Sequence, residues 1–392
     1  EEWIMLRFTV PRDIYYGENA IDHLKNVKGN KAILIFGSER IIKDGTIPKI
    51  EGLLKEANIE TELFYGVESD PGINTVRRGA EAMKKFQPDL IVAIGGGSPI
   101  DAAKAMWLFY EYPDMTLEEA TKPFSLPPLR QKAQFIAVST TSGTGTEATS
   151  FSVITDDETN FKYPLADYNL TPDLAIADTN LVKNLTPTLV ADTGMDALTH
   201  NLEAYVATAK NPISDGLSIK STEMIFDMLY NSFKGDMEAR GEMHVAQLMA
   251  GMSFSNAMLG IVHSMAHKSS HHYGISHGRS NAIYLPYVIQ YNAKVAAADY
   301  ADLAKRLGLK GETTDELVEA LIQAIKDLRA SMGMPGSLKE FGVTEEKFKS
   351  NIDEVAELAV GDPCTGTNPR EVSVAEMKRI FEYAYEGKEI DF

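Results

Sequence analysis

Two short apolar runs, each closed by glycine, constrain the fold of this chain more than any other feature. The first is Ala32–Phe36, followed by Gly37, and the second is Leu90–Ile94, followed by Gly95. An apolar run of this length that ends at a turn residue is typical of a strand buried on both faces of a sheet. Because segments with helical periodicity lie between such runs, the pattern predicts a parallel sheet covered by helices.

The length of 392 residues favours two domains, each with its own apolar core. After about Asp178, long stretches rich in Ala, Met, Leu and Glu replace the strand-like runs. We therefore predict an α/β protein, with a Rossmann-like parallel-sheet domain at residues 1–180 and an all-helical domain at 181–392. Further strands are expected at 61–65, 135–138 and 174–177. Helices are expected at 47–57, 75–86, 189–207, 212–230, 238–255, 286–298, 300–307, 314–332, 344–359 and 372–385.

Composition excludes several classes of function. The formal net charge of −18 repels a phosphate backbone, so nucleic acid is not an expected partner. No stretch has the roughly 18 consecutive apolar residues that span a bilayer, so no membrane is expected either. Residues 1–5 lack the pattern of a secretory leader, and the single cysteine, Cys364, cannot form an intrachain disulfide. We expect a soluble, cytoplasmic protein.

The segment from Gly95 to Asp101 joins a predicted strand to a predicted helix through Gly96, Gly97, Ser98 and Pro99. Glycines let the backbone approach a pyrophosphate, and the free N–H groups at a helix start favour an anion. The spacing differs from the GxGxxG of the common dinucleotide fold, so the motif is only moderately specific. The alternative is a tight turn that binds nothing.

A second polar turn, Ser139–Glu147, follows the strand expected at 135–138. It combines two glycines with Ser and Thr hydroxyls, which offer many hydrogen-bond donors to a ligand. In the alternative reading, these hydroxyls only satisfy their own backbone in a solvent-facing turn.

Histidines cluster near the middle of the second domain, where five of the eight lie between positions 263 and 277. His263 and His267 are four residues apart, as are Asp196 and His200, so each pair shares one face of a helix. Three imidazoles and one carboxylate could enclose a divalent ion, and this donor set suits iron or zinc without choosing between them.

A histidine taken alone is more often an ordinary hydrogen-bonded side chain than a metal ligand. We read His23 and His244, which stand outside the cluster, as surface residues. His271 and His272 are adjacent and therefore point in different directions, so we do not count them as ligands.

Together these motifs resemble the iron-dependent (group III) alcohol dehydrogenases, the family of lactaldehyde reductase, the butanol dehydrogenases and the alcohol-dehydrogenase half of bifunctional aldehyde-alcohol dehydrogenase. Several motifs in the family's order are more specific than any one of them. The matching segments, which span nearly the whole chain, are 11–17, 95–101, 140–147, 162–167, 194–200, 260–278 and 364–370.

The resemblance implies the dehydroquinate-synthase-like fold of this family, with the metal and substrate between a dinucleotide-binding domain and a helical domain. It implies that the metal ligands are Asp196, His200, His263 and His277, and that His267 is the unligated catalytic histidine beside the nicotinamide. It implies a homodimer as well. The cofactor-binding residues implied by the motifs and the resemblance are Gly37, Ser38, Arg40, Gly96, Gly97, Ser98, Asp101, Thr140, Thr141, Thr144 and Lys162.

Two departures from the family pattern matter. Where NAD-preferring members carry an Asp after the first strand, this chain has Gly37 and Ser38, which removes the repulsion of a 2′-phosphate. Arg40 favours that phosphate and Glu39 opposes it, so NADP(H) is favoured modestly over NAD(H). The second departure is the segment 268–272, where the family often has a glycine shortly after the second helical histidine.

We therefore expect an alcohol dehydrogenase that moves hydride between a primary alcohol, or its aldehyde, and NAD(P), with Fe²⁺, or alternatively Zn²⁺, stabilising the substrate as an alkoxide. His267 would relay the hydroxyl proton. Other enzymes of this fold remain alternatives, namely a glycerol dehydrogenase, a maleylacetate reductase or a dehydroquinate-synthase-like lyase. A non-catalytic nucleotide- and metal-binding protein or a filament subunit is a further alternative.

Overall fold

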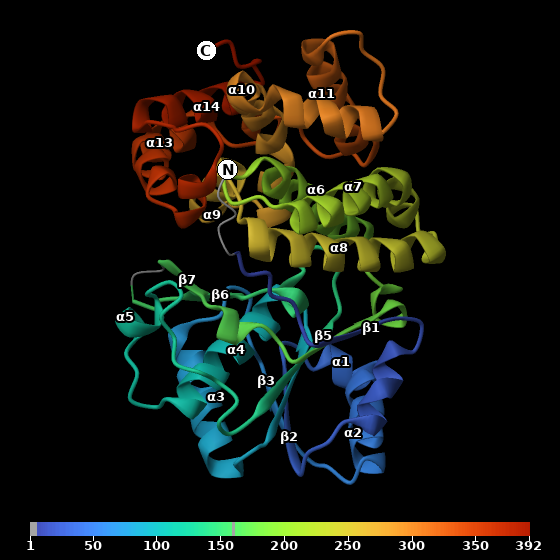
Figure 1. The fold of residues 1–392 in the computed structure, drawn as a ribbon. Coiled ribbons are helices and arrows are strands. Elements are labelled where there is room, and N and C mark those ends of the chain that lie inside the picture. Colours follow the sequence, from blue (N-terminus) through green and yellow to red (C-terminus); the bar gives the residue numbers. More distant parts are fainter. Residues whose placement is uncertain (1–5, 159–160) are drawn as a thin grey trace. The chain divides into compact units, whose positions relative to one another are not determined.

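The computed structural model describes residues 6–158 and 161–392. Residues 1–5, at which a secretory leader was not expected, lie outside the described part. The chain forms two compact units, one ending at Asn184 and the other running from Leu185 to Phe392 (Figure 1). The boundary predicted after residue 180 falls shortly before this division. The first unit contains a parallel sheet and the second is helical, which confirms the predicted fold class.

The sheet of the first unit has six parallel strands in the order β1-β8-β5-β4-β2-β3. All five predicted strands are present, but β1 was not expected, because its short sequence has no continuous apolar run and it lies at the sheet edge. The strands are β1 (Asp13–Gly17), β2 (Lys31–Phe36), β3 (Glu60–Tyr65), β4 (Leu90–Gly95), β5 (Gln134–Ser139) and β8 (Leu174–Asp178).

Helices cover both faces of this sheet (Figure 1). Alternate residues of β2 enter different cores, Ile33 and Ile35 on one face and Leu34 and Phe36 on the other. This two-sided burial explains the continuous apolar runs of the central strands, such as Ala32–Phe36 in β2. The remaining elements of the unit are η1 (Ala20–Asn26), α1 (Arg40–Lys43), α2 (Thr46–Glu56), α3 (Ile73–Phe86), α4 (Gly97–Glu111), α5 (Leu117–Ala120), η2 (Thr146–Ala148), the antiparallel pair β6 (Phe151–Thr155) and β7 (Lys162–Ala166), η3 (Tyr168–Leu170) and η4 (Thr179–Val182).

The second unit is built from helices with well-defined starts. Thr186 caps the first of them, with Pro187 in its first turn, and Asn211 caps the next, followed by Pro212. The elements are α6 (Pro187–Val206), α7 (Pro212–Phe233), α8 (Met237–Ala257), α9 (Ile261–Tyr273), α10 (His277–Arg306), α11 (Thr314–Ser331), α12 (Leu338–Phe341), α13 (Glu345–Val360), η5 (Pro363–Thr367) and α14 (Val374–Glu386).

The helix α10 corrects the prediction of two separate helices at 286–298 and 300–307. It is a single helix of 30 residues with Pro286 inside it. A proline has no N–H, so the carbonyl four residues earlier, that of Ala282, loses its helical partner. Nη1 of Arg329 donates a hydrogen bond to this carbonyl at 3.1 Å, which allows the helix to continue through the proline.

The helix α8 corrects the reading of His244 as a surface residue, because its side chain is fully buried. The helix packs against both α6 and α7, so more of its circumference is covered than a one-sided apolar stripe would indicate. Among the described residues, no single helix is long and apolar enough to cross a membrane. Only α8 and α9 together, with a bend of 107° between them, reach that length and composition.

Candidate functional site

The helix α6 carries a row of polar side chains on one buried face. Asp192, Asp196, His200 and Glu203 follow each other at intervals of three or four residues, which places them on successive turns of the same face. All four are buried. A row of buried ionisable groups is costly unless each group has a partner, so it marks a site rather than ordinary packing.

The helix α9 contributes His263 and His267 one turn apart. It begins after Gly260, where an added Cβ would lie 3.0 Å from Oε1 of Glu203 and 2.8 Å from Oδ1 of Asn368. Because glycine has no side chain, Glu203 can reach the start of α9, where the Val262 amide donates a 2.7 Å hydrogen bond to Oε1. This contact fixes α9 against α6.

The start of α10 is fixed to α6 in a similar way and carries His277. Asp192 accepts hydrogen bonds from the Ser276 hydroxyl at 2.7 Å and from Nε of Arg279 at 3.0 Å. At Gly278, an added Cβ would lie only 2.1 Å from the carbonyl oxygen of Asp192, so any side chain there would push the two helices apart. These contacts hold His277 beside Asp196.

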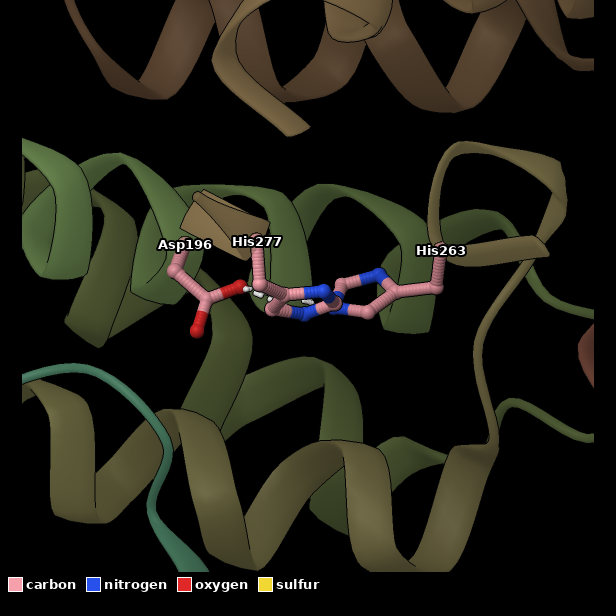
Figure 2. A group of neighbouring side chains, drawn as sticks. All are labelled: Asp196, His263 and His277. Atoms are coloured by element: carbon pink, nitrogen blue, oxygen red, sulfur yellow. Dashed lines mark ion pairs between the residues drawn. The ribbon is translucent and has the colours of Figure 1, made fainter. Parts of the chain in front are cut away.

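The side chains of Asp196, His263 and His277 converge (Figure 2), with potential ligand atoms all within 4.8 Å of one another. Oδ1 of Asp196 lies 3.5 Å from Nε2 of His263 and 3.4 Å from Nε2 of His277. His200 lies at the edge of this group, with Nε2 3.8 Å from the same oxygen and its ring stacked on that of His263 at 4.6 Å. The structure thus places the three predicted histidine ligands around one oxygen of the fourth, Asp196, with His263 and His277 nearer than His200.

Charge at the cluster favours a cation. Burial alone would raise the pKa of the Asp196 carboxyl, but the imidazoles of His200, His277 and His263 outweigh burial and hold that pKa well below its usual range. Burial would lower the pKa of His263, yet the Glu203 and Asp196 carboxylates raise it to about 9. The site therefore attracts positive charge in the form of a proton or a metal ion, and its nitrogen and oxygen donors fit a divalent transition metal.

Two residues of this site were not predicted from the sequence. Nδ2 of Asn281 donates a hydrogen bond to Oδ1 of Asp196 at 2.7 Å, and it lies 3.1 Å from Nε2 of His263 and 3.3 Å from Nε2 of His277. Glu203 lies 2.5 Å from Nδ1 of His263. Both residues are one turn from a predicted ligand, Asn281 after His277 and Glu203 after His200. Polar residues at helical spacing from a ligand are the signal that would have identified them.

His267, the predicted catalytic histidine, lies beside the cluster. Its side chain is 25% exposed, and Nδ1 lies 3.1 Å from Oδ2 of Asp362. Its ring stacks on that of His277, with centroids 5.4 Å apart. His267 is therefore next to the candidate ligands while its Nδ1 is held by a different carboxylate.

In the first unit, the predicted cofactor-binding loops follow the carboxyl ends of β2, β4 and β5. The sheet continues from β2 to β3 on one side, whereas β4 lies on the other side of β2. Such a reversal of strand order creates a crevice in which open α/β sheets bind their ligands. Gly37 follows β2 and Gly96 follows β4, so both predicted glycines lie at this edge.

The glycine turn and the threonine turn fit closely together. An added Cβ at Gly96 would lie 2.9 Å from Oγ1 of Thr141, and one at Gly97 would lie 3.2 Å from Cγ2 of Thr144. Gly95 has a φ of +154°, and a Cβ there would meet Pro99 at 2.6 Å. Gly96 thus allows the close approach of the two turns, whereas Gly95 is favoured by its own φ and by its contact with Pro99. The amide of Thr140 donates a 2.9 Å hydrogen bond to the Gly95 carbonyl, which ties the turns together.

Two further predicted cofactor residues have protein partners in this unit. Nζ of Lys162 forms an ion pair with Oδ1 of Asp70 at 2.7 Å, and the Asp70 amide donates to the Ser98 hydroxyl at 3.3 Å. The Asp101 carboxylate accepts hydrogen bonds from the Thr146 hydroxyl at 2.6 Å and from the Val153 amide at 3.0 Å. In the structure, Lys162 lies beside the glycine turn, while Asp101 supports the loop after the threonine turn.

The residues expected to decide between NADP(H) and NAD(H) follow the end of β2. Ser38 and Arg40 are exposed, and the Ser38 hydroxyl accepts a 3.1 Å hydrogen bond from the Arg40 amide. The Glu39 carboxylate lies 3.4 Å from Nζ of Lys43, one turn further on. Glu39 was the residue that argued against NADP(H), and its charge is partly balanced by this lysine.

Comparison with known proteins gives consistent matches over almost the whole chain. The family model described as iron-containing alcohol dehydrogenase matches residues 11–179, and that of the Fe-containing alcohol dehydrogenase family, C-terminal, matches 190–385. The chain is 54% identical over 388 residues to an NADPH-dependent butanol dehydrogenase of Clostridium saccharobutylicum, covering 99% of this chain and 100% of that protein.

Two further relatives agree with this result. A bifunctional aldehyde-alcohol dehydrogenase of Escherichia coli is 40% identical over 417 residues, which cover 98% of this chain but only 47% of that protein. The solved structure of an iron-containing alcohol dehydrogenase from Thermococcus thioreducens superposes with a TM-score of 0.90 at 33% identity, covering 97% of this chain and 100% of that one.

Proposed function

The chain belongs to the iron-containing alcohol dehydrogenase family, and on that premise we propose that Asp196, His200, His263 and His277 hold a divalent iron ion. The protein is an alcohol dehydrogenase. The observation that carries the proposed site is the convergence of the Asp196 carboxylate with the imidazoles of His263 and His277 (Figure 2). None of the relatives described above is named as a glycerol dehydrogenase or a maleylacetate reductase.

The donor set supports this metal assignment. Three imidazole nitrogens and one carboxylate oxygen suit Fe²⁺ and also permit Zn²⁺. The ion would supply Lewis-acid polarisation of the alcohol or aldehyde oxygen. Three of the four proposed ligands are oriented by protein partners: Glu203 holds His263, Asn281 holds Asp196, and Asp192 holds the helix start that carries His277. The His277 side chain is 39% exposed, which leaves the site accessible on its side.

We propose NADP(H) as the preferred cofactor. The turn after β2 has Ser38 where an aspartate would repel a 2′-phosphate, and the nearby Glu39 carboxylate is paired with Lys43. The name of the Clostridium saccharobutylicum relative, an NADPH-dependent enzyme, supports the same preference. Gly96, Gly97 and Ser98 would cradle the pyrophosphate at the start of α4, where the amide groups and the helix dipole favour an anion.

We propose that the substrates are primary alcohols and their aldehydes. In the oxidative direction, a bound nicotinamide would accept the carbon-bound hydrogen as hydride, and His267 would accept the hydroxyl proton and release it to solvent. An imidazole suits this role because it accepts and releases protons near neutral pH. The physical support is the position of His267, whose ring stacks on that of His277.

We also propose that the protein works in the cytoplasm as a homodimer. The single cysteine suits a reducing compartment, which does not require disulfides. The dimer rests on the family resemblance, and light scattering of the purified protein tests it by giving the mass in solution.

The experiment that tests the proposed function combines metal analysis with activity. The purified protein is analysed for bound metal and is then assayed, after loading with ferrous iron or zinc, on short and medium primary alcohols with NADP⁺ and NAD⁺. We expect about one iron per chain, and reduction of NADP⁺ that is lost in D196A together with the iron. Turnover that persists in D196A without metal would contradict the proposal.

A further inference from the structure

The imidazole of His267 is held by a carboxylate far away in the sequence. Its Nδ1 lies 3.1 Å from Oδ2 of Asp362, a residue 95 positions further on that precedes η5. The Asp362 side chain is only 4% exposed. Nζ of Lys268, the neighbour of His267 on α9, lies 3.1 Å from the same oxygen. Lys268 belongs to segment 268–272, which departs from the family pattern. The ion pair gives Lys268 the role of a second partner for Asp362.

The two oxygens of Asp362 have separate functions. Oδ1 accepts the backbone N–H of Cys364 at 3.0 Å and so caps η5, which leaves Oδ2 for His267 and Lys268. The Asp362 carboxylate faces three N–H donors, from His267, Lys268 and the Cys364 amide, which together hold it as an ionised acceptor. An ionised carboxylate only accepts hydrogen bonds. Nδ1 of His267 must therefore carry its hydrogen, and Nε2 is the nitrogen left to accept a proton.

The neighbouring histidine on α9 shows the same arrangement. Nδ1 of His263 lies 2.5 Å from the buried carboxylate of Glu203, and its Nε2 lies 3.5 Å from Oδ1 of Asp196. A carboxylate on Nδ1 fixes the tautomer and the ring orientation of a functional histidine. Both histidines of α9 therefore have Nδ1 beside a buried carboxylate from another segment. The same need to fix the tautomer and the ring orientation explains both contacts.

We propose that Asp362 is a positioning residue that holds His267 as the Nδ1–H tautomer with its ring against His277, so that Nε2 can take the substrate's hydroxyl proton. The inference rests on the proposed role of His267. In the reaction, the alcohol loses a hydride to NADP⁺ and its hydroxyl proton to Nε2, which yields the aldehyde, NADPH and an imidazolium that then releases the proton. Asp362 keeps its charge throughout and contacts His267 rather than the substrate.

The variant D362N separates this role from structural support. Asparagine is as good a helix cap as aspartate, so its carbonyl oxygen can still accept the Cys364 N–H. Its amide N–H₂ then replaces Oδ2 and favours the opposite tautomer of His267, with hydrogen on Nε2. The matched control is K268M, which removes the second partner of the same oxygen but leaves the bond to His267.

The experiment measures kcat and KM of the iron-loaded wild type, D362N, K268M, H267A and the double variant D362N/H267A. We expect D362N to lower kcat by about 100-fold, within the usual range for proton-transfer catalysis, with iron content and KM for NADP⁺ unchanged within about threefold. K268M should lose less than about fivefold. In the H267A background, D362N should have no further effect, because Asp362 acts through His267.

A second readout does not depend on activity. ¹⁵N-histidine NMR of the zinc-loaded protein should show hydrogen on Nδ1 of His267 in the wild type and on Nε2 in D362N. If H267A lowers kcat but D362N keeps the wild-type kcat, or if D362N causes the same loss in the H267A background, the inference is wrong and the role of His267 stands. If H267A retains the wild-type kcat, the proposed role of His267 fails and the inference fails with it.

Discussion

Nδ1 of His263 lies 2.5 Å from Oε2 of Glu203, and both side chains are almost completely buried. Oε1 of the same carboxylate accepts the Val262 amide hydrogen at 2.7 Å, so Glu203 holds both the imidazole and the backbone of α9. This relationship orients Nε2 of His263 toward Asp196, which lies 3.5 Å away. The proposed metal site therefore depends on a residue that is not itself a proposed ligand.

E203Q should weaken metal binding. Glutamine has one acceptor oxygen for two N–H donors, so either His263 or Val262 loses its partner. We expect metal affinity to fall by about 10- to 100-fold, measured by competition with a chelator. The control is E242Q, at an exposed position on α8, which should bind metal like the wild type. If E203Q folds normally and keeps wild-type affinity, Glu203 does not orient the ligand.

G96A should weaken cofactor binding through steric contact between the two turns. The new Cβ would lie 2.9 Å from Oγ1 of Thr141, and relief of such overpacking typically costs about 1–3 kcal/mol, or roughly 5- to 150-fold in affinity. A fluorescence titration with NADPH measures the change, and metal content should not change. T141A removes the clashing atoms, and because Thr141 is itself a proposed cofactor residue, the double variant is compared with T141A alone. G96A should then cost little further affinity. The same loss from G96A in both backgrounds would argue against the close approach of the turns as the cause.

S38D should reverse the cofactor preference. A carboxylate after β2 would repel the 2′-phosphate of NADP⁺ and accept hydrogen bonds from the ribose hydroxyls of NAD⁺. We expect kcat/KM with NADP⁺ to fall at least about tenfold, while the value with NAD⁺ is unchanged or higher. The neighbouring E39Q, which only removes the charge paired with Lys43, should shift the ratio slightly toward NADP⁺. An S38D enzyme that still prefers NADP⁺ as strongly as the wild type would place cofactor selection elsewhere.

The stability of the first unit should show a pH-dependent contribution from Asp89. Burial alone would raise the pKa of this carboxyl, but hydrogen bonds from the Lys31 and Asn30 backbone amides at 2.9 Å outweigh burial and lower it. A folded-state pKa below the unfolded one means that the stabilisation is present above about pH 4 and is lost as pH falls through the folded pKa.

The matching measurement is urea unfolding of the wild type and D89N at several pH values. At pH 7, D89N should be less stable by about 1 kcal/mol, a modest value because Asp89 is partly exposed. The difference should shrink toward zero in strong acid, where the wild-type carboxyl is protonated. A difference that is constant from pH 7 to the acid range would contradict the assigned role of the charge.

The parts of the fold predicted correctly from sequence are those with a strong local pattern. Strands such as β2 are buried on both faces and therefore contain a continuous apolar run, here Ala32–Phe36, whereas β1 and the pair β6 and β7 are partly exposed and carry no such signal. The helix start predicted at Pro286 was wrong, because Arg329, 43 residues further on, satisfies the carbonyl that the proline leaves free and α10 continues through the proline. No local pattern reveals a partner at that distance.

The residues of the candidate site also divide into those that a local sequence pattern indicates and those that only folding brings together. His263 and His267 were identified by their helical spacing, and Glu203 and Asn281 lie one turn from His200 and His277, so the same periodicity could have found them. Asp362 is different. Only folding brings it to His267, and its local sequence indicates no more than the cap of a short helix.

The central claim is that one cation is held jointly by four side chains, and anomalous diffraction at the iron absorption edge tests it most directly. In crystals of the iron-loaded protein, we predict a single strong peak at coordination distance, about 2.0–2.3 Å, from Asp196, His200, His263 and His277. A peak elsewhere in the protein, or one that lies beyond coordination distance from His200 or Asp196, would contradict the account.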